Sequence, residues 1–387
     1  MGKRELLLIG AFIVVGVVMY QLTAAPPPAG TRTGTVGGFL DHVRREIRGN
    51  RFYAEVSSST THPVDASMSE VRLRLGGTVR LTVTGEDRGD VQIDLKVRSN
   101  GYDEAEAQRL AKQSVDALKI DNAGAAMIAV VTYPDPGSQW PTATVKVPAR
   151  LRVRIEQAAS ITASGVHTLE LAPTRGDATI SNVSDLVSGN HRGGKLNIEK
   201  CGNVKLTTGG SQLTVKDVKD LALSMRSGEL EASGLRGAIE LDTNQADVRI
   251  SAIDKAKGPI RINAVGGEVI VDGLASEARI DGRNTSISVS LLQPVPLAIY
   301  NEGDEDVTLT PPAAGYKLDA VVRGGRILPP DLLKELGITH EEGAESNEAR
   351  ASGAVRGGGP TITVRTNRGN LVLKPRQLPA DQSPTSK

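Results

Sequence analysis

Residues 211–235 read SQLTVKDVKDLALSMRSGELEASGL, and the pattern inside this stretch decides the fold. Leu213 and Val215 alternate as in a strand, and Val218 follows three positions later. The same apolar triplet recurs as Ile161/Ala163/Val166, Ala178/Ile180/Val183, Leu196/Ile198/Cys201, Leu230/Ala232/Leu235, Val248/Ile250/Ile253, Val269/Val271/Leu274 and Ile287/Val289/Leu292. Its central member advances by 17, 18, 17, 17, 18, 21 and 18 residues from Ala163 to Val289. A steady period of this size is typical of an array of stacked repeats.

Each triplet is followed by a second short alternating strand and then a polar turn. Leu221 and Leu223 form such a strand, and Thr208 to Ser211 form such a turn. These strands are too short to build independent hairpins, so stacking unit on unit is needed to bury their aliphatic side chains. The sequence therefore predicts an all-β fold, a β-solenoid of short stacked strands with about 17–21 residues per coil. We also expect one capping helix in the N-terminal part and a single N-terminal transmembrane helix.

Alternation also predicts which side chains point inward, because adjacent strand residues face opposite sides. The predicted structural core consists of Ile180, Val183, Ile198, Cys201, Val215, Val218, Leu235, Ile250, Ile253, Val271, Leu274, Val289 and Leu292.

Composition excludes several classes of partner and of covalent cross-link. Lys and Arg (46) balance Asp and Glu (45), so net charge gives no case for a nucleic-acid partner or an anionic surface. Aromatic residues make up only 3% of the chain, which suits thin aliphatic layers. A single cysteine excludes an intrachain disulfide.

The N-terminus carries an apolar run from Leu6 to Ala25, preceded by Lys3 and Arg4. About 20 such residues can cross a bilayer as a helix, and the preceding positive charges favour a cytoplasmic N-terminus. We therefore expect a single-pass protein of the inner (cytoplasmic) membrane with the remainder exported to the periplasm or cell surface. A cleaved signal peptide is the alternative, and a buried helix of a soluble domain is a minor third.

Composition and pattern divide the chain into seven segments. They are a signal-anchor at 1–25, a tether at 26–68, a β-rich segment at 69–150 with a helix at about 103–118, repeats at 151–326, a helical turn and loop at 327–358, a closing hairpin at 359–375 and a tail at 376–387.

Several of these features resemble the DUF4097 family, the bacterial β-strand repeat proteins also called putative adhesins. The resemblance rests on Val145 to Pro148, Leu151 to Val153, the strand–turn units and the closing segment from Gly357 to Leu373, and it covers residues 70–375. It implies a membrane-tethered protein exposed in the cell envelope, and it transfers no catalytic residues.

Three features of the sequence are candidates for chemical sites. Cys201 occupies a triplet position that is apolar in the other repeats, which favours a buried small side chain over a nucleophile. His191 lies in the Gly-containing stretch 188–193, which predicts a surface turn. The acidic turn with Glu302, Asp304, Glu305 and Asp306 is a weak Ca²⁺ candidate, because a solvated turn explains it as well. No cofactor is expected.

A polysaccharide-cleaving enzyme is the catalytic rival, but the expected outward ladders bring no acid–base pair and no aromatic platform together. We expect a non-catalytic, adhesin-like or scaffold surface for a protein or envelope-polymer partner, with the membrane as a further partner through the N-terminal helix. An accessory or sensory ectodomain of an envelope-stress or regulatory system is the alternative.

Overall fold

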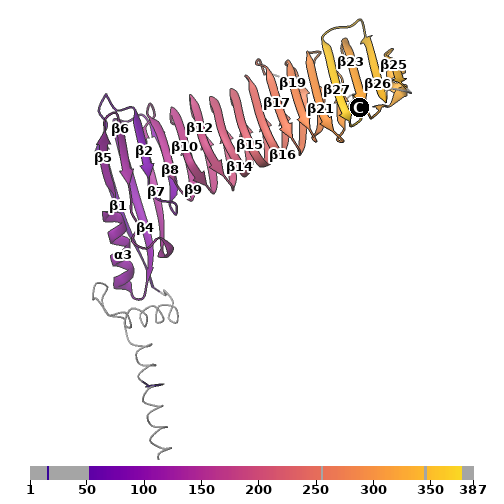
Figure 1. Cartoon of the computed structure of the whole chain (residues 1–387). Coiled ribbons are helices and arrows are strands. Elements are labelled where there is room, and N and C mark those ends of the chain that lie inside the picture. The colour runs from indigo at the N-terminus through magenta and orange to yellow at the C-terminus, as the bar shows by residue number, and fades with distance from the viewer. Residues whose placement is uncertain (1–14, 17–51, 254–255, 344–346, 377–387) are drawn as a thin grey trace, which may run out of the picture.

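The computed structural model describes residues 15–16, 52–253, 256–343 and 347–376. In this part of the chain the strands form one 28-stranded sheet of mixed parallel and antiparallel pairs. Figure 1 shows a long column of stacked strands joined at one end to an N-terminal sheet whose longest strands extend away from the column. We call these two regions the column and the N-terminal block.

The N-terminal block combines antiparallel strands with one helix. Its elements are β1 (Phe52–Pro63), β2 (Glu70–Arg74), β3 (Arg80–Glu86), β4 (Asp90–Gly101), α3 (Glu104–Asp116), β5 (Lys119–Ala123), β6 (Ala126–Val130), a 3₁₀ turn (Pro136–Ser138) and β7 (Gln139–Pro148). Strand β4 lies between β1 and β7, antiparallel to both. The Asp103 carboxylate accepts a hydrogen bond of 2.7 Å from the Glu106 backbone N–H and caps α3. The helix packs its small residues, Ala107 and Ala111 among them, toward β1 and β4.

The column continues from the block through parallel strands. They are β8 (Arg152–Gln157), β9 (Ser160–Ser164), β10 (Thr168–Arg175), β11 (Asp177–Ser181), β12 (Leu186–Arg192), β13 (Lys195–Glu199), β14 (Asn203–Lys216), β15 (Asp220–Ser233), β16 (Ile239–Ser251), β17 (Ile260–Val265), β18 (Glu268–Leu274), β19 (Ala278–Arg283), β20 (Ser286–Leu291), β21 (Leu297–Gly303) and β22 (Val307–Thr310). Leu213 pairs with Leu230, and Leu230 with Val248, so each residue lies beside its equivalent in the next repeat. Burial alternates along these strands, and the apolar residues fill one continuous core.

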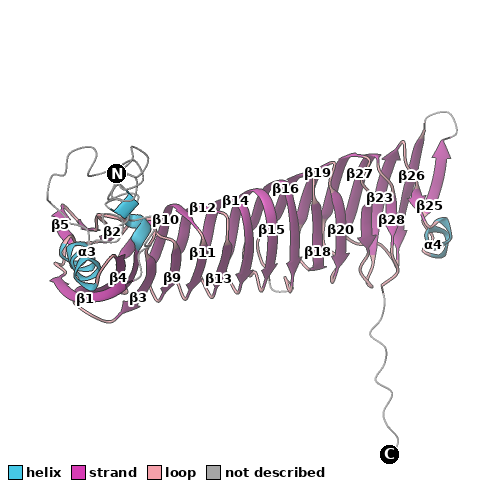
Figure 2. Ribbon diagram, turned by 90° about the horizontal axis from the view of Figure 1, so that it is seen from below, coloured by secondary structure: helices cyan, strands magenta, loops and turns pink. Residues whose placement is uncertain are grey.

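The far end of the column again uses antiparallel pairs. Its elements are β23 (Tyr316–Arg323), β24 (Ile327–Leu328), α4 (Pro330–Glu335), β25 (Thr339–Gly343), β26 (Glu348–Val355), β27 (Thr361–Arg368) and β28 (Leu371–Leu373). Strand β27 joins β21 in parallel and β26 pairs antiparallel with β23. Figure 2 shows α4 and β25 at this end of the molecule, opposite the N-terminal block with α3.

The predicted fold class is correct in being all-β but wrong in its architecture. The strands belong to a large mixed sheet, not to a β-solenoid of short strands, and β14 and β15 each run for 14 residues through what the sequence pattern divides into two. The physical reason is that alternation has the same period in parallel and antiparallel strands, so it fixes the buried face and not the direction of the neighbour.

The predicted transmembrane helix is also not found. Among the described residues, no helix has both the length and the apolar character that a membrane crossing requires. Most of the apolar run, 6–14 and 17–25, lies outside these residues, as do most of the tether and the tail from 377 onward.

One predicted core residue is misplaced by a single position. Leu292 is 39% exposed, whereas Leu291 is buried at 2%. The register shifts between Val271 and Leu274, and Leu274 then pairs with Leu291. Because a one-residue slip in a strand moves a side chain to the opposite face, the irregularity exchanges the two leucines. The other predicted core residues are buried, at no more than 2% exposure.

Candidate functional surface

A row of exposed polar side chains crosses five neighbouring strands of the column. The parallel register aligns one residue from each of β12, β14, β15, β16 and β17, namely Asn190, Thr207, Ser224, Asp242 and Asn263. We call this row the polar ladder. Neighbouring strands lie about 4.8 Å apart, so the ladder presents a hydrogen-bonding group at that interval. Asn263 Nδ2 donates to Asp242 Oδ1 over 2.8 Å, which orients the last two members.

Two adjoining hollows flank the polar ladder. One hollow of about 730 Å³ is lined by all five ladder residues, and a second of about 520 Å³ is lined by the first four. The larger hollow extends toward Arg192, Gly209 and Arg226, which lie side by side in register. Gly209 carries no side chain, so a gap remains between the two arginines. The outer surface is therefore concave where the ladder runs.

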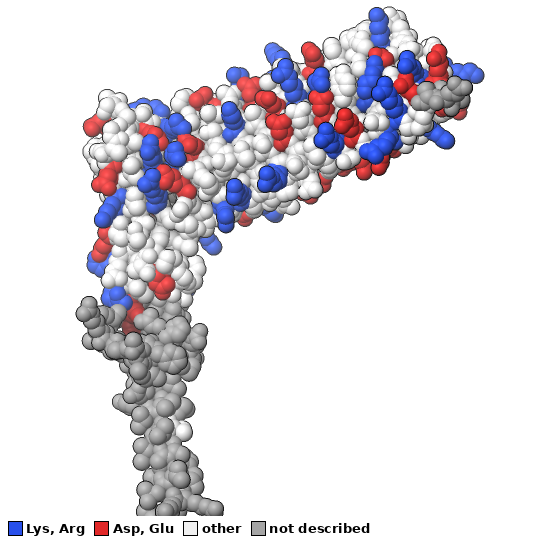
Figure 3. Space-filling model, in the orientation of Figure 1, with Lys and Arg blue, Asp and Glu red and all other residues white. Residues whose placement is uncertain are grey.

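The rims of the hollows carry both signs of charge. Arg192 and Arg226 are exposed on one side, and Lys205 and Glu240 border the other hollow. Figure 3 shows Lys and Arg interspersed with Asp and Glu on the face in view, with dense groups near the N-terminal end of the column and at its far end. A partner would therefore meet mixed charges and not a field of one sign.

His191 lies beneath the larger hollow, and the expectation of a surface turn is wrong. The residue belongs to β12 and is only 1% exposed, with Nδ1 3.1 Å from Thr174 Oγ1. Burial lowers the pKa of the His191 imidazole, partly opposed by the nearby backbone carbonyl groups of Gly193 and Gly176. The strand continues through Gly189, which has a φ of +120°. The pairing with β10 shifts register between Leu171 and Thr174, after which Thr174 lies opposite His191.

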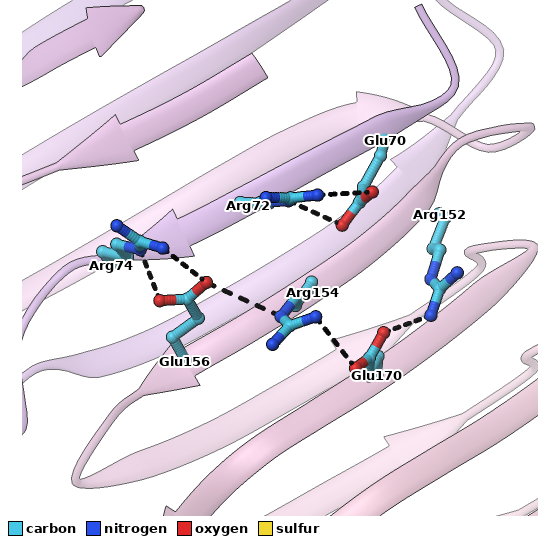
Figure 4. A network of polar contacts seen from close by, with 7 residues as sticks. All are labelled: Glu70, Arg72, Arg74, Arg152, Arg154, Glu156 and Glu170. Atoms are coloured by element: carbon cyan, nitrogen blue, oxygen red, sulfur yellow. Dashed lines mark hydrogen bonds and ion pairs between the residues drawn. The ribbon is translucent and has the colours of Figure 1, made fainter. Parts of the chain in front are cut away.

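A second polar cluster joins the N-terminal block to the column. Figure 4 shows arginines and glutamates alternating across β2, β8 and β10. Arg154 lies between two carboxylates, 3.6 Å from Glu156 and 3.2 Å from Glu170. Arg74 also pairs with Glu156, and Arg152 with Glu170. These contacts tie three strands together, and every carboxylate in them is already paired.

The remaining predicted site residues lie apart from this surface. Cys201 is 2% exposed, its Sγ donates to the Glu199 carbonyl over 3.3 Å, and burial raises the pKa of its thiol. Such a thiol is protonated and unreactive at neutral pH.

The acidic turn does not converge on one point. Glu302 pairs with Arg283 and Asp304 with Arg368, while the Asp306 carboxylate accepts two hydrogen bonds from Asn370. Within the described ranges, no group of three or more acidic, histidine or cysteine side chains is arranged to hold a metal ion.

Sequence reasoning missed the polar ladder, although its signal is present. The ladder residues follow one another at intervals of 17, 17, 18 and 21 residues, the same intervals as the apolar triplets. Polar side chains at this period look like those of any solvated face. Only the hollows distinguish this row.

Comparison with known proteins gives structural likeness alone. The sequence matches no known protein family and no curated protein. Solved structures that align with it are putative adhesins from Parabacteroides merdae and Parabacteroides distasonis and a putative cell adhesion protein from Clostridium sporogenes, each at 10% identity. Their TM-scores are 0.31, 0.31 and 0.19, and the alignments cover 82%, 82% and 83% of this chain. They cover 96%, 97% and 100% of the other chains, and the DUF4097 family is not confirmed.

Proposed function

We propose that this chain is a non-catalytic, adhesin-like protein of the cell envelope, and that its polar ladder binds an extended envelope polymer. We place the protein at the inner (cytoplasmic) membrane, with its C-terminal part exported to the periplasm or cell surface. On the strand–turn units and the closing segment from Gly357 to Leu373, we further infer a distant relation to the DUF4097 proteins.

The observation that carries the proposal is the match between the ladder and a repeating ligand. The exposed ladder residues offer hydroxyl, amide and carboxylate groups, all of which bind hydroxyl-rich chains through hydrogen bonds. Because they repeat at about 4.8 Å along the column, a polymer lying lengthwise meets a similar group at every strand. The two hollows give it room on both sides of the row.

A substitution that fills the two hollows with a large side chain tests this proposal. Thr207→Trp places an indole in both hollows, whereas Thr214→Trp adds the same bulk to another face of the same strand, β14. We expect the full chain carrying Thr207→Trp to bind purified envelope polysaccharide at least about tenfold more weakly in cosedimentation, a loss of about 1.4 kcal/mol. Thr214→Trp should bind like the wild type.

Equal binding by the two variants would refute the ladder as the binding surface. If the wild type binds intact envelopes but not the purified polysaccharide, and protease treatment of the envelopes abolishes binding, the partner is a protein and the polymer proposal is wrong.

A further inference from the structure

Exposed aromatic side chains gather at one end of the N-terminal block. Phe52, Tyr53 and Trp140 are 51%, 63% and 51% exposed. Strand register places Tyr53 and Trp140 on the same face of the sheet, because Tyr53 pairs with Asn100 while Arg98, two residues before it on β4, pairs with Trp140. Phe52, next to Tyr53 on β1, lies at the same end but points to the opposite face. Other large exposed apolar side chains of the described column, such as Val265 and Tyr300, lie on separate strands far from this end.

Basic side chains accompany these aromatics. The Arg98 guanidinium stacks on the Tyr53 ring, with its carbon 4.1 Å from the ring centre. A hollow of about 530 Å³ beside Trp140 is lined by Arg80, Lys96 and Arg98. Lys96 pairs with Glu55 at 2.7 Å, but in the described part of the chain neither Arg80 nor Arg98 has a carboxylate within ion-pair distance. The cluster therefore has a net positive charge.

We propose that this aromatic–basic end of the N-terminal block lies on an anionic lipid bilayer. Trp and Tyr favour the level of the lipid head groups, where the ring is half buried and its polar atom stays hydrated. Each Lys or Arg near an anionic bilayer strengthens attachment about fivefold. Arg80 and Arg98 meet lipid phosphates, and Trp140 enters the head-group layer beside them. The inference rests on the proposed membrane residence and not on the polar ladder.

The course of the chain identifies the bilayer as the occupant. Only 26 residues, Pro26 to Arg51, separate the end of the apolar run at Ala25 from the start of β1. Strand β1 begins with the exposed Phe52 and Tyr53, so the chain enters the block at the aromatic–basic end. The polar ladder begins at β12, in the column beyond β8 and β10, and stays free for another partner.

Trp140 is the only tryptophan in the sequence, so its fluorescence reports on this end directly. The full chain is placed in vesicles of phosphatidylcholine or of equal parts phosphatidylcholine and phosphatidylglycerol, each with lipids brominated near the head group. We expect a blue-shifted emission and strong quenching in the anionic vesicles, with weaker quenching in the neutral ones. Arg98→Ala should lower the ratio of docked to undocked protein about fivefold.

Arg279→Ala is the matched control. Arg279 is also an exposed arginine stacked on a tyrosine, at 4.8 Å from the Tyr300 ring centre, but it lies on β19 in the column. This variant should be quenched like the wild type.

Flotation separates the two ways in which the inference can fail. If the protein floats with the vesicles but Trp140 is not quenched in either composition, the aromatic–basic end does not touch lipid and the inference is wrong. An emission that is blue-shifted without lipid and unquenched with it shows that the chain covers its own aromatics, which also overturns it. Failure to float with either vesicle refutes membrane residence itself.

Discussion

The column and the N-terminal block bury similar aliphatic side chains but connect them differently. In the column, strands from adjacent repeats pair in parallel, so Ile180 meets Ile198 and contacts stay within about one repeat in sequence. In the block, Gln139 meets Ser99, 40 residues away, and at its junction with the column Arg74 meets Glu156, 82 residues away. The column is therefore built of similar local layers, whereas the block must assemble as a whole.

A hydrogen-bonded cluster in the block contrasts with several buried polar groups of the column that, like Tyr133 Oη in the block, have no hydrogen-bond partner among the described residues. In the block, Gln139 Nε2 lies 2.7 Å from Ser114 Oγ and 3.0 Å from both Ser99 Oγ and the Leu110 carbonyl. In the column, the inward side chains of His191, Thr208 and Thr243 each keep a buried polar atom without a hydrogen-bond partner among the described residues. Repetition places a polar residue at the same corner in several layers, but it does not supply each with a partner.

The largest expected effect concerns the layers of the column. Ile250 is fully buried in β16, whereas its neighbour Arg249 is exposed. Ile250→Asp should lower the free energy of unfolding by at least about 4 kcal/mol, because it buries an unpaired carboxylate. Arg249→Asp should change it little. Thermal unfolding of both variants checks this, and equal losses would show that the register of β16 is wrong.

Close approach between layers predicts the next effect. A Cβ on Gly189 would lie 2.0 Å from the Leu171 carbonyl oxygen, and its φ of +120° disfavours other residues. Gly189→Ala should lower the free energy of unfolding, measured by chemical denaturation, by about 3 kcal/mol. Gly210 has a φ of +66°, but a Cβ there would have no atom within 4 Å. Gly210→Ala should therefore lower the free energy of unfolding by only about 1 kcal/mol. A Gly189 variant as stable as the Gly210 variant would contradict the tight contact between β10 and β12.

Replacing a hydrogen-bonded polar side chain and replacing an unpaired one should change the free energy of unfolding in opposite directions. Gln139→Leu leaves the Ser99 and Ser114 hydroxyls short of a partner and should lower the free energy of unfolding by about 2 kcal/mol. Thr208→Val removes a hydroxyl that has no partner and should raise it by about 1 kcal/mol. Chemical denaturation of the two variants measures both signs. A loss with Thr208→Val would mean that its hydroxyl is hydrogen-bonded.

The smallest effect depends on pH. Burial lowers the pKa of His191 below its ordinary value of 6.5, so the unfolded chain takes up this proton at a higher pH than the folded one. The contribution of neutral His191 to the free energy of unfolding is fully present above pH 6.5. It is lost as the pH drops toward the lower pKa of the folded state. The slope is at most about 1.4 kcal/mol per pH unit.

Denaturation between pH 7.5 and pH 5.5 measures this slope. The His191→Gln variant should lose less stability over that range than the wild type. Parallel curves for the two proteins would show that His191 does not titrate differently on folding.

Side-chain alternation could be read from the sequence because it depends only on neighbouring residues. Val215 and Ile250 are buried where the apolar period places them, and their partners lie one repeat away. The exchange of Leu291 and Leu292 could not be read, because a bulge after Val271 shifts the register without altering the residue pattern. Strand β1 of the block could not be assigned either, because Phe52–Pro63 has no apolar alternation to mark it.

By itself, the sequence determined which side chains of the column face inward and how far apart equivalent residues lie, because alternation and period are properties of the chain alone. Only the tertiary structure decided that the strands join one mixed sheet, that His191 is buried and that Asn190 to Asn263 line a concave face. It also decided that Tyr53, Arg98 and Trp140 meet at one end of the block. The physical reason is that strand direction, bulges and hollows arise from contacts between distant segments, and an alternating pattern is the same whichever neighbour the strand meets.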